Sequence, residues 1–172
     1  MSEQTREKTK EKRVILVGNP NVGKSVIFKH LTGQYVTVSN YPGTTVEVAW
    51  GKSRFGGEKY QVIDTPGINS FSPLSEDEKV ARDLLLKENH SVIIQVADAK
   101  NLRRTLWLTL QLAELGLPLI LALNIMDEAR AQGIEIDVEK LSQLIGVEVI
   151  PTIATQKKGI GTLIEKIPFS QK

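Results

Sequence analysis

The chain has 172 residues, 41% hydrophobic and 24% charged, and its 22 basic and 20 acidic residues leave a formal net charge of +2. These values are typical of one globular domain, and the near balance of charge gives no sign of a nucleic-acid partner or an acidic membrane surface. Cysteine is absent, which excludes disulfides, thiolate zinc sites and a cysteine nucleophile.

Both ends of the chain are predicted to be tails. Residues 1–12 mix charges without an apolar stretch, so they predict a solvated, flexible segment and not a signal peptide. The longest apolar stretch, residues 115–126, contains Pro118 and Asn124 and is too short to span a bilayer. We therefore expect one soluble domain over residues 13–167 and a short tail over 168–172.

Short β-branched runs alternate with helical patterns, which is typical of a parallel sheet covered by helices on both faces. The first half predicts a buried strand at 14–17, a helix at 24–31, a loop at 39–45, two strands at 46–54 and 59–64, and a helix at 76–87. The second half predicts a strand at 92–97, a helix at 102–115, an apolar strand at 119–123, a helix from the N-cap Asp137 to 145, a strand at 147–151 and a helix at 162–167.

A phosphate-binding motif lies between the first predicted strand and helix. Residues 18–25 read GNPNVGKS, which matches G-x-x-x-x-G-K-S in the strand-to-helix setting that this motif requires. Its glycines let successive backbone N–H groups surround an anion, and the helix N-terminus adds partial positive charge. Lys24 is expected to reach the β- and γ-phosphates, and the Ser25 hydroxyl is expected to bind Mg²⁺.

Two further elements complete the predicted phosphate and metal site. Asp64-Thr-Pro-Gly67 ends a strand about forty residues after the P-loop, so Asp64 is expected to hold Mg²⁺, usually through water, and the Gly67 N–H to contact the γ-phosphate. Between them lies Pro42-Gly-Thr-Thr45, where a threonine hydroxyl completes the metal shell when the γ-phosphate is present. We prefer Thr45 to Thr44 for this role.

Guanine selectivity is predicted from Asn124-Ile-Met-Asp127, directly after the apolar strand. The Asp127 carboxylate can accept from the ring N–H and the exocyclic amine of guanine. Adenine lacks both donors and would leave the carboxylate unpaired, at a cost of ~1–3 kcal/mol or more. Asn124 is expected to brace the loop, and the Ala154 N–H in the loop 152–154 to meet the guanine oxygen.

These elements in this order predict an α/β, Ras-like P-loop GTPase fold with a six-stranded, mostly parallel sheet that contains one antiparallel strand. The expected ligands are GTP and GDP with Mg²⁺, which Ser25, Thr45 and Asp64 would hold. The predicted nucleotide-binding residues are Gly18, Asn19, Pro20, Asn21, Val22, Gly23, Lys24, Ser25, Val26, Gly43, Thr44, Thr45, Asp64, Thr65, Pro66, Gly67, Asn124, Ile125, Met126, Asp127, Thr152, Ile153 and Ala154.

Beyond these motifs, the chain resembles the GTPase domain of the FeoB family of prokaryotic ferrous iron transport proteins over about residues 13–167. The resemblance rests on NYPGTTVE at 40–47, SEDEKVAR at 75–82, ADAKNLRRTLWLTLQLAEL at 97–115 and MDEARAQGIEID at 126–137. It implies a cytoplasmic regulatory domain of an Fe²⁺ transporter, at the cytoplasmic face of the cell membrane in the full-length protein. It also implies that the chain is a fragment, cut or naturally separated near Lys172. Its partners would be the helical and membrane-spanning regions of the parent protein, through which an oligomer could also form.

The resemblance also implies a catalytic role for Asn21, similar to a residue that helps bind K⁺ beside the phosphates in FeoB-like GTPases. Lys24 and Asn21 are therefore the predicted catalytic residues. A bound K⁺ would supply positive charge at the phosphates. Ile68 stands where Ras-like enzymes carry a water-orienting glutamine, so water would be positioned by the backbone, another residue or an outside group.

Two residues depart from the usual guanine-binding motifs. Ile125 replaces the lysine of N-K-x-D, and Ile153 replaces a small hydroxyl residue in the last loop. We expect the first change to weaken nucleotide affinity and leave guanine preference intact. Two alternatives stay open at this point: a self-standing Era-like GTPase in ribosome or tRNA assembly, and a nucleotide-binding switch with negligible hydrolysis.

Overall fold

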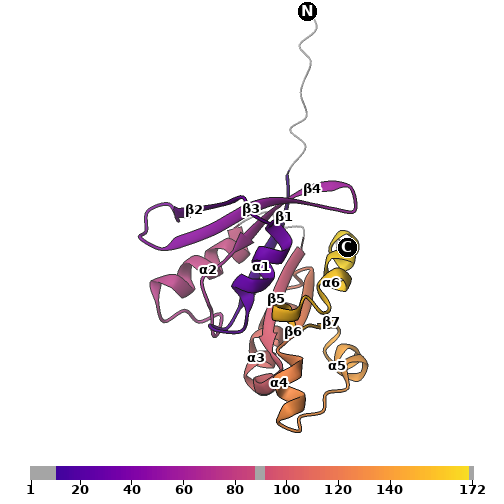
Figure 1. Ribbon diagram of the computed structural model, residues 1–172. Helices are drawn as coiled ribbons and strands as arrows, with labels where there is room; N and C mark the ends of the chain where they lie inside the picture. The colour runs from indigo at the N-terminus through magenta and orange to yellow at the C-terminus, as the bar shows by residue number, and fades with distance from the viewer. Residues whose placement is uncertain (1–10, 88–91, 171–172) are drawn as a thin grey trace, which may run out of the picture.

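The computed structural model describes residues 11–87 and 92–170, which form one sheet flanked by helices (Figure 1). Residues 1–10 and 171–172 of the predicted tails lie outside the described residues. The strands are β1 (Lys12–Gly18), β2 (Val36–Asn40), β3 (Glu47–Phe55), β4 (Glu58–Asp64), β5 (Val92–Asp98), β6 (Leu119–Asn124) and β7 (Glu148–Pro151). The α-helices are α1 (Lys24–Thr32), α2 (Glu76–Lys87), α3 (Leu102–Glu114), α4 (Met126–Ala131), α5 (Val138–Ile145) and α6 (Ile160–Lys166), and 3₁₀ turns are η1 (Ala99–Asn101), η2 (Ala154–Gln156) and η3 (Ile167–Phe169).

The sheet has the strand order β2-β3-β4-β1-β5-β6-β7. Strands β4, β1, β5, β6 and β7 pair in parallel, whereas β3 is antiparallel to both β2 and β4. Within this sheet only β3 therefore runs against the others, which agrees with the expected single antiparallel strand. The expected count of six strands is wrong, because β2 adds a seventh at the edge. All five residues of β2 are exposed, so it lacks the run of buried residues that indicates a strand packed against a core.

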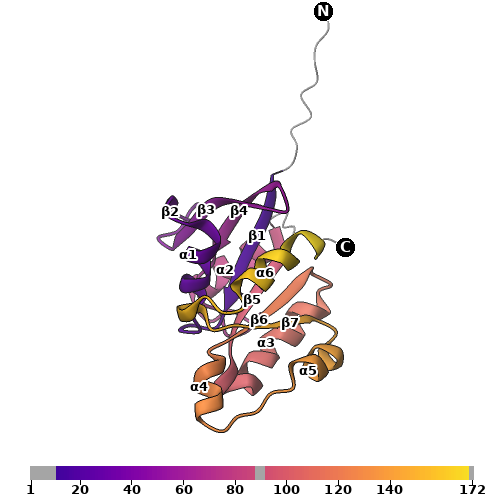
Figure 2. The same ribbon diagram turned by 45° about the vertical axis from the view of Figure 1, so that its right-hand side comes forward.

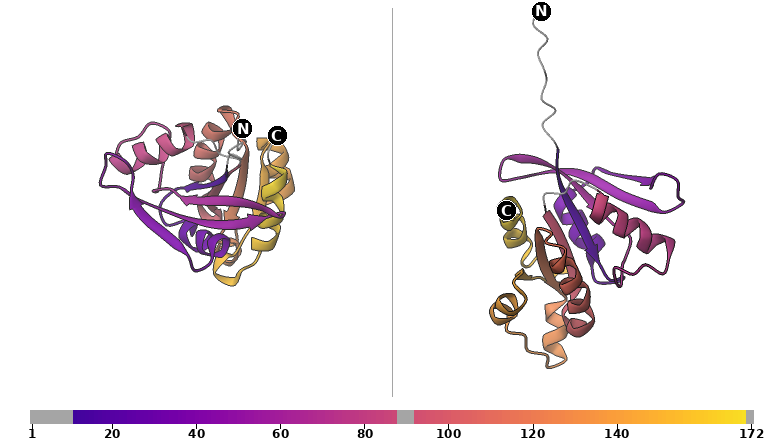
Figure 3. Two further views of the ribbon diagram at one scale, coloured as in Figure 1. Left: turned by 90° about the horizontal axis from the view of Figure 1, so that it is seen from above. Right: turned by 180° about the vertical axis from the view of Figure 1, so that it is seen from behind.

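Helices cover both faces of the sheet, as expected. Helices α1 and α6 pack on the face formed by Val14 and Leu16 of β1. Helices α2 and α3 pack on the opposite face, against Ile15 and Val17 of the same strand, and Figure 3 shows α1 and α2 separated by the sheet. Strand β1 is apolar throughout its middle because its alternate side chains enter two different cores.

The last third of the chain extends the sheet and adds one helix that the sequence did not predict. Helix α5 begins at the predicted N-cap, where the Asp137 carboxylate accepts from the Lys140 N–H at 3.0 Å, and Gly146 ends it with φ 66°. Helix α4 was not predicted: it has only six residues. Figure 2 shows α4 below β6, apart from α6. Among the described residues, no helix has the length and apolar character needed to cross a membrane.

This topology brings the predicted motifs together. Strands β1, β4 and β6 end at Gly18, Asp64 and Asn124. Because these strands run in the same direction, their carboxyl ends meet at one edge of the sheet, where open α/β folds bind ligands.

Candidate nucleotide-binding site

The P-loop, residues 18–25, connects β1 to α1 and requires glycine at two positions. A Cβ on Gly18 would lie 2.3 Å from the Val96 carbonyl oxygen. Gly23 has φ +89°, and a Cβ there would lie 2.3 Å from Asn124 Nδ2. Gly23 also caps α1 without a side-chain hydrogen bond, so no capping side chain occupies the first N–H groups of the helix, which suit an anion.

The pocket beside these N–H groups has a volume of about 340 Å³ and is lined by residues 19–26 and Gly67. This places the predicted phosphate-binding residues of two separate motifs around one space. Asn21 is exposed on this rim, with a positive φ of 63°.

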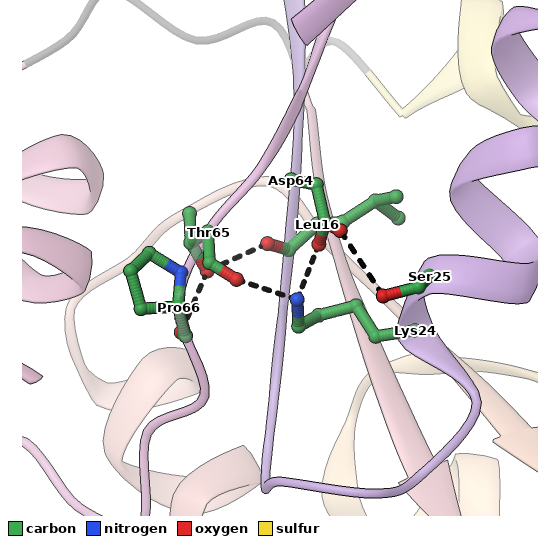
Figure 4. A network of polar contacts seen from close by, with 6 residues as sticks. All are labelled: Leu16, Lys24, Ser25, Asp64, Thr65 and Pro66. Atoms are coloured by element: carbon green, nitrogen blue, oxygen red, sulfur yellow. Dashed lines mark hydrogen bonds and ion pairs between the residues drawn. The ribbon is translucent and has the colours of Figure 1, made fainter. Parts of the chain in front are cut away.

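Lys24, Ser25 and Asp64 form one polar cluster at the edge of this pocket (Figure 4). The Lys24 ammonium forms an ion pair with the Asp64 carboxylate and donates to the Thr65 carbonyl oxygen at 2.5 Å. Ser25 Oγ donates to Asp64 Oδ2 at 3.4 Å. The hydroxyl and carboxylate predicted to bind Mg²⁺ are therefore adjacent, and hard oxygen donors are the ligands that this ion prefers.

The two candidate threonines behave differently. Thr44 Oγ1 donates to the Tyr41 carbonyl oxygen at 2.9 Å and accepts from the Val46 N–H at 3.1 Å, so the Thr44 hydroxyl shapes the turn. Thr45 is exposed. Thr45 is thus the threonine whose hydroxyl has room to reach a metal, although its predicted role stays a prediction.

Asn124, at the end of β6, fastens three segments to one another. Its Nδ2 donates to the Val22 carbonyl oxygen at 3.0 Å, and its Oδ1 accepts from Thr152 Oγ1 and from the Ala154 N–H, both at 3.0 Å. Asn124 is only 3% exposed, so these bonds are shielded from water. The predicted brace is present, but the Ala154 N–H that was expected to meet the guanine oxygen already donates to Asn124.

A second pocket, of about 140 Å³, lies next to Asn124 and is lined by Gly23, Val26, Asn124, Ile125, Asp127, Glu128, Ile153, Ala154 and Thr155. Gly23 and Val26 line both this pocket and the P-loop pocket. The two spaces therefore adjoin, with Asp127 lining the smaller one and the P-loop lining the larger one.

Several predicted binding residues turn their side chains into the protein. Asn19 is 4% exposed and donates from Nδ2 to the Ile68 carbonyl oxygen at 3.2 Å, and the Thr65 hydroxyl donates to the Leu16 carbonyl oxygen at 2.8 Å. The side chains of Asn19 and Thr65 are therefore engaged within the protein and do not face a ligand. The side chains of Val22, Met126, Thr152, Ile153 and Ala154 are buried as well.

Ile68 is fully buried and packs with Ala81 and Leu85 of α2. Its N–H donates to the Gly18 carbonyl oxygen at 2.9 Å. A Cβ on Gly67 would lie 2.9 Å from Pro20 Cγ, so the backbone at Gly67 lies close against the P-loop. The side chain at the position of the usual glutamine belongs to the core.

Two contacts near the site were not predicted. His30 Nε2 lies 2.8 Å from the Ala154 carbonyl oxygen, which is an acceptor, so the ring nitrogen donates and joins α1 to the loop after β7. Glu78 accepts from the N–H groups of Asn69 and Leu74. The Leu74 N–H, followed by the Asn69 donors, holds the pKa of Glu78 below its ordinary value.

The comparisons with known proteins agree on one family. The family model described as "Ferrous iron transport protein B" matches residues 12–167. The Fe(2+) transporter FeoB of Staphylococcus aureus (strain COL) is 41% identical over 152 residues, which are 88% of this chain and 23% of that protein. The chain thus spans about a fifth of the length of the curated relatives it matches.

Solved structures extend the match to the fold. The FeoB G-domain from Methanococcus jannaschii is 43% identical with a TM-score of 0.81, over 93% of this chain and 97% of that one. The cytosolic domain of the T. maritima FeoB iron transporter in its GMPPNP form is 40% identical with a TM-score of 0.88, over 94% of this chain and 64% of that one. These matches decide against an Era-like protein, and the chain belongs to the ferrous iron transport protein B family, whose G domain it corresponds to.

Proposed function

We propose that the chain binds GTP and GDP with Mg²⁺ and hydrolyses GTP slowly, as the regulatory G domain of a ferrous iron transporter. The observation that carries the proposal is the Asn124 side chain, which joins the P-loop to the loop after β7 beside two adjoining pockets. The proposal is supported by the T. maritima relative, whose cytosolic domain has GDP and GMPPNP forms.

Guanine recognition is assigned to Asp127, which lines the smaller pocket. The test is titration of the chain with GDP and ADP in the presence of Mg²⁺, together with the variant Asp127→Asn. We expect GDP to bind at least tenfold more tightly than ADP, because each ~1.4 kcal/mol of lost pairing changes affinity tenfold. Comparable affinities for the two nucleotides would contradict the assignment.

Binding of Mg²⁺ and nucleotide requires the Lys24–Asp64 ion pair to separate. Lys24 would then reach the β- and γ-phosphates, and Asp64 and Ser25 would hold Mg²⁺, which would supply positive charge to the phosphates. The Lys24 ammonium pairs with the same Asp64 carboxylate that Mg²⁺ would need. We therefore expect Mg²⁺ alone to bind weakly, and to bind tightly only together with nucleotide.

We infer that hydrolysis is stimulated by K⁺ through Asn21, on the rim of the P-loop pocket. Ile68 is buried and supplies no polar side chain, so an added cation is a reasonable source of transition-state charge. Steady-state GTP turnover is to be compared in KCl and NaCl for the parent chain and for Asn21→Ala. Equal rates in the two salts would remove the K⁺ hypothesis.

A single-turnover assay distinguishes a slow enzyme from a switch that only binds nucleotide. We expect an intrinsic rate on the order of 10⁻⁴–10⁻² s⁻¹, as in unassisted GTPases. The partners proposed for the nucleotide-dependent change are the helical and membrane-spanning regions of the parent transporter, at the cytoplasmic face of the membrane. No phosphate release above the buffer blank over a day would favour the pure switch.

A further inference from the structure

The side chain of Asn69 lies where three parts of the domain meet. Its Oδ1 accepts from Arg104 Nη2 of α3 at 2.7 Å and from Asn19 Nδ2 of the P-loop at 3.4 Å. Its backbone N–H and its Nδ2 donate to Glu78 Oε1 at 3.2 and 3.1 Å. One amide thereby connects the P-loop, α2 and α3 through both its oxygen and its nitrogen.

These contacts fix the segment 67–78 at both ends. At its start, Asn19 Nδ2 also donates to the Ile68 carbonyl oxygen at 3.2 Å. At its end, Glu78 Oε2 accepts from the Leu74 N–H at 2.8 Å. Asn19 and Glu78 are 4% and 7% exposed, so water does not compete strongly for either side chain, and Asn69 is the residue that links them.

The segment matters because Gly67 lines the P-loop pocket. The Gly67 N–H is the group expected to contact a γ-phosphate, which GTP has and GDP lacks. A segment already held in place loses less conformational freedom when it meets this phosphate, and pre-organisation of this kind improves affinity. The benefit reaches only ligands that contact Gly67.

We propose that Asn69 is a positioning residue that sets how strongly this chain prefers a guanosine triphosphate over the diphosphate. It acts through the backbone at Gly67 and Ile68 and does not touch the nucleotide. The inference rests on the proposed guanine-nucleotide binding. It adds a residue outside the nucleotide-binding motifs, and it predicts an effect on a ratio of two affinities rather than on binding as a whole.

The chain offers a graded set of variants for the test. Asn69→Ala removes every side-chain contact of the linking amide, and Asn69→Asp keeps the acceptor for Arg104 but places a carboxylate against Glu78. Arg104→Ala removes one charge-assisted bond from an exposed residue, so it leaves the core intact. Arg103→Ala is the matched control, because Arg103 is an exposed arginine one residue earlier on α3.

Dissociation constants for GMPPNP and GDP are to be measured by calorimetry with Mg²⁺, together with the thermal midpoint of each variant. We expect Asn69→Ala to lower the GMPPNP affinity about tenfold, which equals about 1.4 kcal/mol, with the GDP affinity changed less than about twofold. Asn69→Asp should change the ratio in the same direction, and Arg104→Ala should do so to a smaller extent. Arg103→Ala should match the parent chain.

An unchanged ratio of the two affinities in Asn69→Ala overturns the proposal, even if both affinities fall, because an equal loss is the mark of a purely structural residue. A ratio that shifts toward GMPPNP overturns it too. If Asn69→Ala does not fold, Arg104→Ala and Arg103→Ala decide the question through their difference. Failure of the parent chain to bind GDP contradicts the proposed function itself, and this inference falls with it.

Discussion

Replacing Asn124 with alanine should destabilise the whole domain as well as weaken nucleotide binding. The change leaves the Val22 carbonyl, the Thr152 hydroxyl and the Ala154 N–H without their partner, and each of these bonds measures 3.0 Å. At a net ~1 kcal/mol per hydrogen bond, the loss is about 3 kcal/mol. For a domain of this length, that corresponds to a fall in melting temperature of about 6–12 °C.

The measurement is urea unfolding of the parent chain, Asn124→Ala, Thr152→Val and the double variant. Thr152→Val removes only one of the three bonds and should cost about 1 kcal/mol. In the double variant that bond is already gone, so the two costs should fail to add by about 1 kcal/mol. Additive costs, or a loss below about 1 kcal/mol for Asn124→Ala, would refute the reasoning that Asn124 fastens these segments.

Four more substitutions test separate parts of the structure. Gly23→Ala forces a Cβ to 2.3 Å from the Asn124 amide at φ +89°, so we expect GDP affinity to fall more than tenfold by calorimetry. Gly161→Ala in α6 places its Cβ more than 4 Å from every described atom outside its own helix backbone and its chain neighbours, so it should raise the unfolding free energy by up to ~1 kcal/mol in urea unfolding. The pKa of Glu78 is lowered in the folded chain, so its carboxylate adds stability above its unfolded pKa and loses it as the pH falls through the folded pKa. Glu78→Gln should therefore flatten the acid side of a pH series of urea unfolding, and an unchanged acid side would contradict the assignment. Gln95 has a buried Oε1 without a partner among the described residues, so Gln95→Met should raise the unfolding free energy by about 1 kcal/mol in urea unfolding. A lower unfolding free energy would show that the bond from Gln95 Nε2 to the Thr105 carbonyl oxygen, at 3.2 Å, matters more.

The architecture could be predicted where a long element carries a regular apolar pattern into a core. Helix α2 has the predicted bounds, because its apolar positions recur at helical spacing and charged residues surround them. Strand β2 escaped prediction because its residues are exposed and its place in the sheet comes from pairing with β3, which lies across the loop 41–46. Helix α4 escaped it because six residues carry little periodicity.

The candidate site also has a part that the sequence predicted and a part that it did not. Motifs that end parallel strands could be predicted to meet, since the sheet brings Gly18, Asp64 and Asn124 to one edge. Contacts between side chains on separate elements could not be predicted from the sequence. The His30 contact with Ala154 spans 124 positions, and nothing in either local sequence indicates it. Sequence patterns therefore predicted groups that are expected to face a nucleotide, and the structure added the contacts that hold these groups in place.

Ile125 and Ile153, which depart from the usual guanine-binding motifs, can be interpreted from their positions in the structure. Ile125 has φ +63°, a left-handed conformation that costs an L-residue roughly 1–2 kcal/mol, and it is held between buried Asn124 and α4. Ile153 is 9% exposed and forms two backbone hydrogen bonds with Lys158. Neither isoleucine side chain is needed for the polar contacts that join the loops, because Asn124 makes them with Thr152 and with the Ala154 backbone. The isoleucines at these two positions should therefore affect how tightly a nucleotide binds. The choice between guanine and adenine should still depend on Asp127.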